Sequence, residues 1–284
     1  DKMTTWVSMF SFTEDADLKH LFPLIKKAGY DGVEPVFSEY GYLNEKTSKE
    51  DIRKIGKIAR EEGLEIPSVG VWSLWKYNLV SNQEETRRRA VDIVKKQVEA
   101  AALLGADTVL VVPGYVGCDF VEEPERIRYD KAYERCLEAL KELAAFGADH
   151  NVCIGIENVW NRFLLSPLEM KRLLDEVNSP FVGAYFDVGN VIYTGYPEDW
   201  IEILDSHIKK IHLSDFRYGA AGMSGFVDLF AGDVDFVKVG ESLKRIGYDG
   251  WLTLEMLPNY KQFPEVSLLS NRPAVERIAA LAQK

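Results

Sequence analysis

Short apolar runs rich in β-branched and aromatic residues alternate along the chain with longer segments in which apolar residues recur at helical spacing. The apolar runs predict strands at residues 4–12, 32–37, 65–73, 108–114, 152–159, 182–189, 209–215 and 250–256. The periodic segments predict helices near residues 15–28, 48–62, 83–104, 129–149, 166–177, 197–206, 235–246 and 272–283. Eight such strand–helix units form a parallel sheet that closes into a (β/α)8 barrel, the TIM-barrel class of α/β fold.

The ends of several predicted helices carry residues that start or stop a helix. Ser166 followed by Pro167 is a typical start, and the glycines in KKAGY, EEGLE and LLGAD are typical stops. The segment GYDGVE at 29–34 recurs in GYDGWLTLE at 247–255, which is consistent with a repeated turn between a helix and a strand. Because no linker or low-complexity segment interrupts the pattern, residues 1–284 are predicted to form one domain.

Four polar residues stand within or at the ends of four successive apolar runs in the second half of the chain. They are Glu157 in GIENVW, Asp187 in YFDVGNV, His212 in KIHLSD and Glu255 in LTLEML. The carboxyl ends of barrel strands face the loops that build the active site, so these side chains are predicted to meet at the barrel mouth. The alternative is a histidine satisfied within the core and two glutamates in salt bridges at the mouth.

Three carboxylates held this close together would repel one another strongly without a cation. A shared divalent ion therefore explains the cluster, with Glu157, Asp187, His212 and Glu255 as its ligands. Oxygen and nitrogen ligands without a thiolate favour Mn²⁺, Mg²⁺ or Co²⁺, and Zn²⁺ suits this set less well. We predict one divalent metal ion, with Mn²⁺ as the first choice.

The charge of the chain narrows the class of partner. A formal net charge of −11 argues against binding to nucleic acid or to an anionic membrane, because both need clustered Lys and Arg. With an apolar fraction of 46%, the chain can build a substantial core, and a small molecule is the expected partner. The sequence is also compatible with a homo-oligomer, either a dimer or a tetramer.

The cysteines and the apolar runs bear on location. Cys118, Cys136 and Cys153 lack the spacing of a metal site and are odd in number, which favours buried thiols in a reducing compartment. No apolar stretch approaches the roughly 20 residues that span a bilayer, and the first residues, DKMTTWVSMF, lack the pattern of a signal peptide. We therefore expect a cytoplasmic protein.

The motifs resemble those of the xylose isomerase-like barrel superfamily of sugar isomerases and epimerases. The likeness runs from IPSVGVWSLWKYNLVS through YFDVGN and KIHLSD to GYDGWLTLEM, and it is most specific in the last third of the chain. Within the superfamily the chain is most similar to the branch of L-xylulose-5-phosphate and L-ribulose-5-phosphate 3-epimerases. The resemblance implies that Glu157, Asp187, His212 and Glu255 bind the metal. It also implies that the two glutamates transfer protons on opposite faces of the substrate.

Two positions refine the comparison. Related ketose 3-epimerases of the tagatose and psicose type carry a histidine three residues after the strand-six aspartate, where this chain has Asn190. The sequence DVGN resembles the phosphopentulose branch instead, and an asparagine there exchanges hydrogen bonds but no proton. Arg217 in HLSDFR is placed like a family arginine that contacts substrate oxygens, although a solvated loop charge is an equally good explanation.

Candidate substrate-binding residues lie just after the predicted strands. Lys76 and Arg217 are the candidates for contact with a phosphate, although no Gly-rich phosphate motif is present. Trp72 and Trp160 are placed to stack on the C–H faces of a sugar, as are Trp75, Tyr77 and Tyr115, although core packing explains any one aromatic residue more simply. Together with Asn190, the predicted substrate-binding residues are Trp72, Lys76, Trp160 and Arg217.

These observations predict a metal-dependent isomerase that epimerises a ketose or ketose phosphate at C3. Glu157 and Glu255 are its predicted catalytic residues, and they exchange protons with a metal-stabilised enediolate. An alternative keeps the same site for lyase or dehydratase chemistry on a keto-sugar, and a carbohydrate-binding barrel without activity is a third candidate. A DNA-repair endonuclease would need further histidines and a basic face, and this chain has four histidines and a charge of −11.

Overall fold

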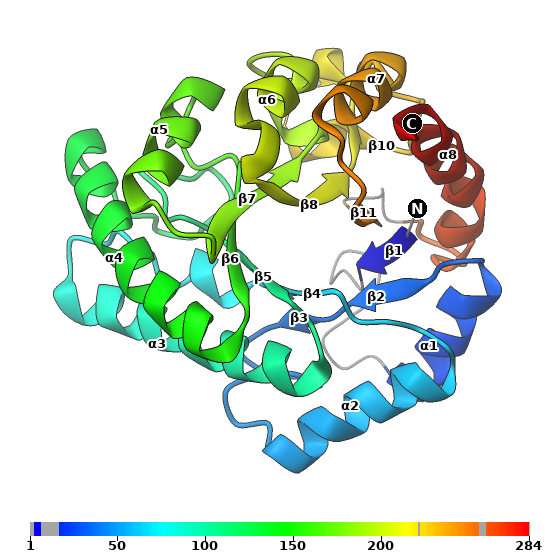
Figure 1. Cartoon of the computed structure of the whole chain (residues 1–284), viewed down its shortest axis with the longest axis horizontal. Coiled ribbons are helices and arrows are strands. Elements are labelled where there is room, and N and C mark those ends of the chain that lie inside the picture. Colours follow the sequence, from blue (N-terminus) through cyan, green and yellow to red (C-terminus); the bar gives the residue numbers. More distant parts are fainter. Residues whose placement is uncertain (1–2, 7–16, 221, 256–259, 284) are drawn as a thin grey trace.

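A computed structural model describes residues 3–6, 17–220, 222–255 and 260–283 of the chain. A curled sheet forms its centre, with the segment order β2-β1-β11-β8-β7-β6-β5-β4-β3, and every pairing in it is parallel (Figure 1). The segments are β1 Met3–Trp6, β2 Gly32–Glu34, β3 Val36–Phe37, β4 Ser68–Val71, β5 Thr108–Val111, β6 Cys153–Glu157, β7 Val182–Asp187, β8 Ile208–Leu213 and β11 Leu252–Leu254.

The two ends of this order, β2 and β3, belong to one run of chain. Pro35 separates them, and a proline has no N–H to donate to a sheet. Because β2 pairs with β1 and β3 pairs with β4, the run at 32–37 joins both ends of the order and closes the barrel. The predicted TIM-barrel class is therefore confirmed.

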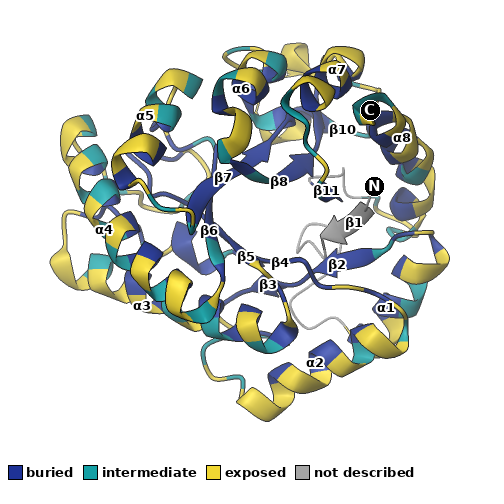
Figure 2. Cartoon of the chain, in the orientation of Figure 1, coloured by how far each residue is buried: buried dark blue, intermediate teal, exposed yellow. Residues whose placement is uncertain are grey.

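Helices surround the barrel, and their buried faces turn toward the strands while their outer faces are exposed (Figures 1 and 2). They are α1 Leu18–Lys27, α2 Lys49–Glu61, α3 Glu84–Leu104, α4 Tyr129–His150, α5 Pro167–Val177, α6 Pro197–Leu204, α7 Phe236–Ile246 and α8 Val266–Ala282. None of the helices in the described ranges is both long and apolar enough to cross a membrane.

Local sequence explains most helix boundaries. The hydroxyls of Ser48 and Ser166 accept hydrogen bonds from the first-turn N–H groups of α2 and α5. Gly105 ends α3 at a φ of 77°, in the left-handed region where glycine carries no steric penalty. These signals are the reason that the predicted boundaries of α2, α3 and α5 lie within one residue of the observed ones.

The structure corrects the start of the last predicted helix and adds a hairpin. Helix α8 begins at Val266 rather than at 272, and Pro273 lies inside it. The predicted strand at 4–12 is described as a strand at Met3–Trp6, and residues 7–12 lie outside the described ranges. Strands β9 Asp215–Phe216 and β10 Phe226–Val227 pair antiparallel in the loop after β8, and both are too short for alternation to predict them.

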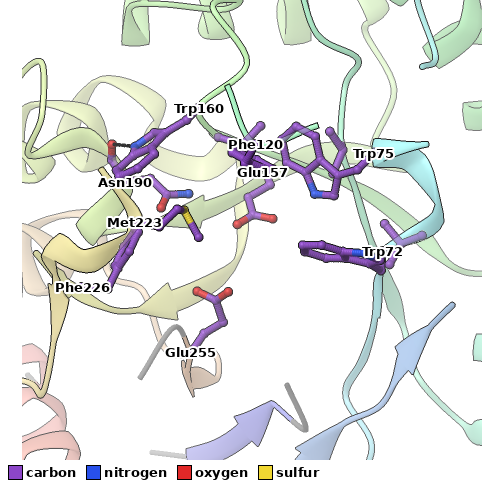
Figure 3. Close-up of a pocket in the computed structure, with 12 residues that line it drawn as sticks. Trp72, Trp75, Phe120, Glu157, Trp160, Asn190, Met223, Phe226 and Glu255 are labelled. Carbon is purple, nitrogen blue, oxygen red and sulfur yellow. Dashed lines mark hydrogen bonds between the residues drawn. The ribbon is translucent and has the colours of Figure 1, made fainter. Parts of the chain in front are cut away.

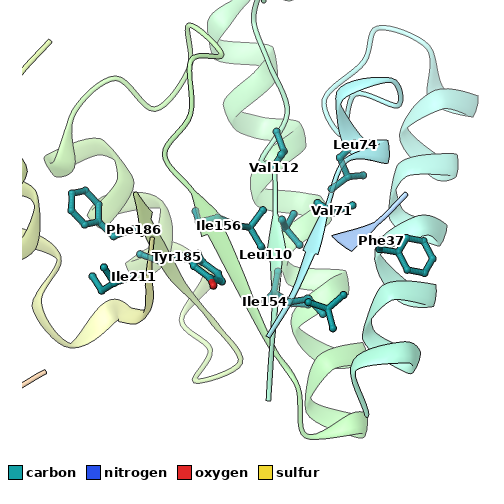
Figure 4. Packing of buried hydrophobic residues seen from close by; sticks show 14 of the residues in the cluster. Phe37, Val71, Leu74, Leu110, Val112, Ile154, Ile156, Tyr185, Phe186 and Ile211 are labelled. Carbon is teal, nitrogen blue, oxygen red and sulfur yellow. The ribbon is translucent and has the colours of Figure 1, made fainter. Parts of the chain in front are cut away.

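The core consists of buried side chains between the barrel and the helices. Aliphatic and aromatic residues of β3 to β8 and the segments that follow them, among them Phe37, Val71, Leu110 and Phe186, pack in one continuous cluster (Figure 4). Burial of this apolar surface is the main favourable term in folding a domain of this size. Inside the barrel, by contrast, several buried residues are polar, and four of them form the site described next.

Candidate active site

The four predicted ligands converge at one end of the barrel. Glu157 and Asp187 are the last residues of β6 and β7, His212 is the penultimate residue of β8, and Glu255 directly follows β11. Parallel register places Asp187 beside His212. All four side chains are buried, so the strands bring three acidic groups and an imidazole together where little of their surface is exposed.

Distances define a common centre. Nδ1 of His212 lies 3.7 Å from Oε1 of Glu157, 3.8 Å from Oδ2 of Asp187 and 4.0 Å from Oε2 of Glu255. Ligand atoms of Glu157, Asp187 and His212 all lie within 4.8 Å of one another. This spacing allows one ion to reach all three of them.

The two oxygens of the Asp187 carboxylate have different surroundings. Oδ1 of Asp187 accepts hydrogen bonds from the hydroxyl of Ser214 at 2.7 Å and from the N–H of Asn190 at 3.1 Å. Oδ2 of Asp187 and Oε2 of Glu255 are buried and have no hydrogen-bond partner within the described ranges. Since burying an unpaired carboxylate oxygen is costly, the arrangement fits a cation at this centre.

Glu34 is a member of the site that the sequence analysis missed. Its Oε1 lies 2.8 Å from Nε2 of His212, and its Oε2 accepts hydrogen bonds from the hydroxyls of Ser68 and Tyr185. The ring of Tyr185 also packs against the imidazole, with centroids 4.4 Å apart. Glu34 ends an apolar run as the four predicted ligands do, so the same criterion applied to the first half of the chain would have identified it.

The shared burial shifts the proton affinities of these groups. Burial raises the pKa of Glu157 to about 7. Burial and the charge of Asp187 also raise the pKa of Glu255 well above its usual range. Burial alone would lower the pKa of His212, but the carboxylates of Glu34, Glu157 and Glu255 raise it well above its ordinary value. Each of these shifts favours the protonated form of its group.

A cavity opens above the centre. In Figure 3 the carboxylates of Glu157 and Glu255 point toward each other across it, with Trp72 and Trp75 on one side and Phe226 on the other. Asn190, Trp160, Met223 and Phe120 also line the cavity, together with valines of the barrel. The arrangement can hold a small organic molecule between two carboxylates and several aromatic rings.

Three of the five predicted substrate-binding residues line this cavity, namely Trp72, Trp160 and Asn190. The indole N–H of Trp160 donates to the carbonyl of Asn190 at 3.0 Å, so the two residues form one wall. The Nδ2 group of Asn190 donates to the carbonyl of Asn158 at 2.8 Å, which fixes the orientation of its side chain.

The other two predicted substrate-binding residues, Lys76 and Arg217, are not among the residues that line the cavity. Lys76 is exposed, and its Nζ lies 2.9 Å from Oε1 of Glu39. The Arg217 side chain is also exposed, and its Nη2 donates to the carbonyl of Ala231 at 2.9 Å. The directions of these side chains depend on loop structure, which strand spacing does not predict.

The loop that carries Met223 and Phe226 is tied to the barrel through the buried carboxylate of Asp215. This carboxylate accepts hydrogen bonds from the N–H groups of Phe216, Phe230, Gly232 and Val234 at 2.8, 2.9, 3.0 and 3.2 Å. The aromatic ring of Phe226 stacks on Trp160, with centroids 5.3 Å apart. A single side chain thus anchors the backbone that carries this wall of the cavity.

Comparison with known proteins agrees with this architecture. The family model described as "Xylose isomerase-like TIM barrel" matches residues 22–277. The chain belongs to this family. It is 25% identical over 254 residues to the L-ribulose-5-phosphate 3-epimerase UlaE of Shigella flexneri, and the match covers 87% of this chain and 84% of that protein.

A second curated relative and a solved structure extend the comparison. The uncharacterized protein MJ1311 of Methanocaldococcus jannaschii is 27% identical over 188 residues, covering 63% of this chain and 60% of its own length. The structure of D-psicose 3-epimerase from Clostridium cellulolyticum H10, with D-tagatose, superposes with a TM-score of 0.80 at 16% identity and covers 100% of both chains. This structural likeness shows that the two chains share a fold.

Proposed function

We propose that this protein is a metal-dependent 3-epimerase of a ketose or ketose phosphate, with Glu157 and Glu255 as its two proton-transferring residues. The observation that carries the proposal is the position of these two carboxylates, which face each other across a cavity directly beside the cluster of Asp187 and His212 (Figure 3). An epimerase needs such a pair, because it removes a proton from one face of a carbon and returns one to the other.

The donor set fits a divalent ion held by Glu157, Asp187, His212 and Glu255. Three carboxylates and one imidazole suit a hard or borderline cation, and Mn²⁺ is the first choice, with Mg²⁺, Co²⁺ and Zn²⁺ as alternatives. When bound, the ion would stabilise negative charge that develops on the substrate oxygens during proton removal. The unpartnered oxygens of Asp187 and Glu255 support this assignment.

The chain's own groups perform the proton transfers. One of the two glutamates accepts the C3 proton, which is acidic because the neighbouring ketone converts the carbanion to an enediolate. The other glutamate donates a proton to the opposite face, and the configuration at C3 inverts.

The walls of the cavity assist by limiting access of water. Trp75 and Phe120 pack edge to face with centroids 4.7 Å apart, and Trp160 stacks on Phe226 on the other side. Aromatic faces pack against the C–H groups of a sugar and leave few places for solvent. Exclusion of water protects an enediolate from stray protonation.

Product analysis in deuterium oxide tests the proposal. The metal-loaded protein is incubated with ketopentoses, ketohexoses and their phosphates, and the products are followed by NMR and mass spectrometry. Epimerisation predicts one deuterium at C3 in a product that otherwise keeps the composition of the substrate. Loss of water or of a substituent would instead identify a lyase at the same site, and absence of exchange with every sugar would contradict the proposal.

A further inference from the structure

We propose that the substrate is an uncharged ketose and not a ketose phosphate, an inference that rests on the proposed function. It starts from the composition of the cavity wall. Nine of the twelve residues that line the cavity are apolar or aromatic, and the three polar ones are Glu157, Asn190 and Glu255. No Lys, Arg or His is among these described lining residues.

Three basic residues close in sequence to the lining residues have other partners. Lys76 pairs with Glu39 at 2.9 Å, and Arg162 pairs with Asp119 at 2.7 Å. Arg217 donates to the carbonyl of Ala231 on its own loop. Each of these side chains is largely exposed, and none lines the cavity. A phosphate held against the lining residues would therefore find no cationic side chain among them to donate the charge-assisted hydrogen bonds that normally bind it.

Two stretches of the sequence outside the described ranges, one after β1 and one after Glu255, also lack cationic residues. Residues 7–16, VSMFSFTEDA, and residues 256–259, MLPN, contain no Lys, Arg or His, and residue 221 is alanine. Their composition excludes them as a source of cationic side chains whatever arrangement they adopt.

A helix N-terminus is the other common way to bind a phosphate. None of the lining residues belongs to an α-helix, since they fall in strand ends, 3₁₀ turns and loops. A phosphate would also enter a cavity that already contains Glu157 and Glu255, next to Asp187. Repulsion between a dianion and these carboxylates opposes binding even when one divalent ion offsets part of their charge.

The same walls suit an uncharged sugar. Trp72, Trp75 and Phe120 form one apolar side, and Trp160, Met223 and Phe226 form the other (Figure 3). Rings placed in this way bind C–H faces and a terminal hydroxymethyl or methyl group, and no buried charge has to be neutralised. The end of the ketose remote from the reacting carbons is expected to contact these rings.

Matched ligand pairs test the inference. D- and L-ribulose and D- and L-xylulose are each compared with their 5-phosphates, both as ligands and as substrates of the Mn²⁺-loaded protein. Binding is followed by tryptophan fluorescence, because three tryptophans line the cavity. We expect the best free ketopentose to bind at least about tenfold more tightly than its phosphate, a difference of about 1.4 kcal/mol.

A charge-introducing variant provides an internal control. Met223→Lys places a cation on the wall and should shift the preference toward the phosphate by roughly tenfold, whereas Met223→Gln should not. Equal or tighter binding of the phosphates to the unaltered protein would overturn the inference, particularly if Lys76→Ala or Arg217→Ala removed that binding. Binding of no member of any pair would overturn it as well.

These outcomes are separable from failure of the proposed function. A protein that prefers the free ketose but never exchanges its C3 hydrogen supports the substrate class and contradicts the epimerase. A protein that epimerises the phosphates faster than the free sugars contradicts the substrate class and supports the epimerase.

Discussion

Glu34 and His212 are separated by most of the chain, yet Oε1 of Glu34 lies 2.8 Å from Nε2 of His212. The other ring nitrogen, Nδ1, faces the three carboxylates of the proposed metal centre. A hydrogen bond at Nε2 keeps the proton there and leaves the lone pair of Nδ1 available for an ion. We interpret Glu34 as a positioning residue for His212.

Replacement of Glu34 should therefore weaken metal binding without removing a ligand. Glu34→Gln keeps the size of the side chain but loses its charge, and we expect Mn²⁺ affinity to fall roughly 10- to 100-fold. Isothermal titration of the metal-stripped protein with Mn²⁺ measures this change. Glu39→Gln is the matched control because that glutamate is exposed and pairs with Lys76. Unchanged affinity in Glu34→Gln would show that the bond to His212 is only structural.

Loss of a metal ligand should lower Mn²⁺ affinity more than loss of the residue that positions that ligand. His212→Ala removes one of four proposed ligands, so its Mn²⁺ affinity should fall by more than the roughly 100-fold limit expected for a supporting residue. His207→Ala is the control, because His207 pairs with Asp175 on the outside of the barrel. Metal content after dialysis and an anomalous-scattering map check the prediction, and a His212→Ala protein that retains its ion would refute the assignment.

The two glutamates are expected to be individually necessary for turnover. Glu157→Gln and Glu255→Gln keep the shape of the side chain and remove its ability to accept a proton, which should lower kcat roughly 10²- to 10⁴-fold. Steady-state kinetics measures the loss, and thermal unfolding shows whether each variant remains folded.

An isotope experiment separates a proton-transfer role from a ligand role. If each glutamate serves one face, each Gln variant should still exchange the C3 hydrogen of one epimer with solvent deuterium, and the favoured epimer should differ between the two variants. Equal loss of exchange for both epimers in both variants would mean that the glutamates act mainly as metal ligands.

Without metal, the stability of the protein should decrease as the pH rises from about 4.5 to 7. A carboxyl with a raised pKa in the folded state binds more protons than in the unfolded state, so folding becomes less favourable as the proton is lost. For Glu157, the rise from 4.5 to about 7 corresponds to a penalty on the order of 3 kcal/mol at higher pH. The raised pKa values of Glu255 and His212 act in the same direction.

Denaturant unfolding of the chelated protein between pH 4.5 and 8 measures this trend. Glu157→Gln should flatten the curve, since an amide does not titrate. Mn²⁺ should stabilise the protein most at neutral and higher pH, where the carboxylates are ionised. A metal-free protein whose stability increases across this range would contradict the raised proton affinities.

The sequence predicts those parts of the fold and site that depend on strand order and strand ends. Glu157, Asp187 and His212 are brought together because consecutive parallel strands are neighbours, and this relationship is visible in the chain itself. Glu34 is different, because its contact with His212 spans the interior of the closed barrel. Helix α8 starts at Val266, six residues before the predicted start at 272, and Pro273 lies within it.

Side-chain direction in loops is the part that the sequence does not specify. Lys76 and Arg217 follow strands at the correct end of the barrel, yet the structure turns one toward Glu39 and the other toward Ala231. Trp72 and Trp160 occupy similar positions in the sequence and do line the cavity. The difference depends on tertiary packing, such as the bond from Trp160 to the carbonyl of Asn190.

The anchoring of a whole loop on the carboxylate of Asp215 has an evolutionary consequence. The proposed ligands lie on strands or next to them, whereas Met223 and Phe226 lie on a segment that four backbone N–H groups attach to one aspartate. Backbone contacts place few demands on side-chain identity, so the residues between the attachment points can diverge while the attachment persists. Such a division would let descendants of this barrel change the wall of the cavity without rebuilding the proposed metal centre.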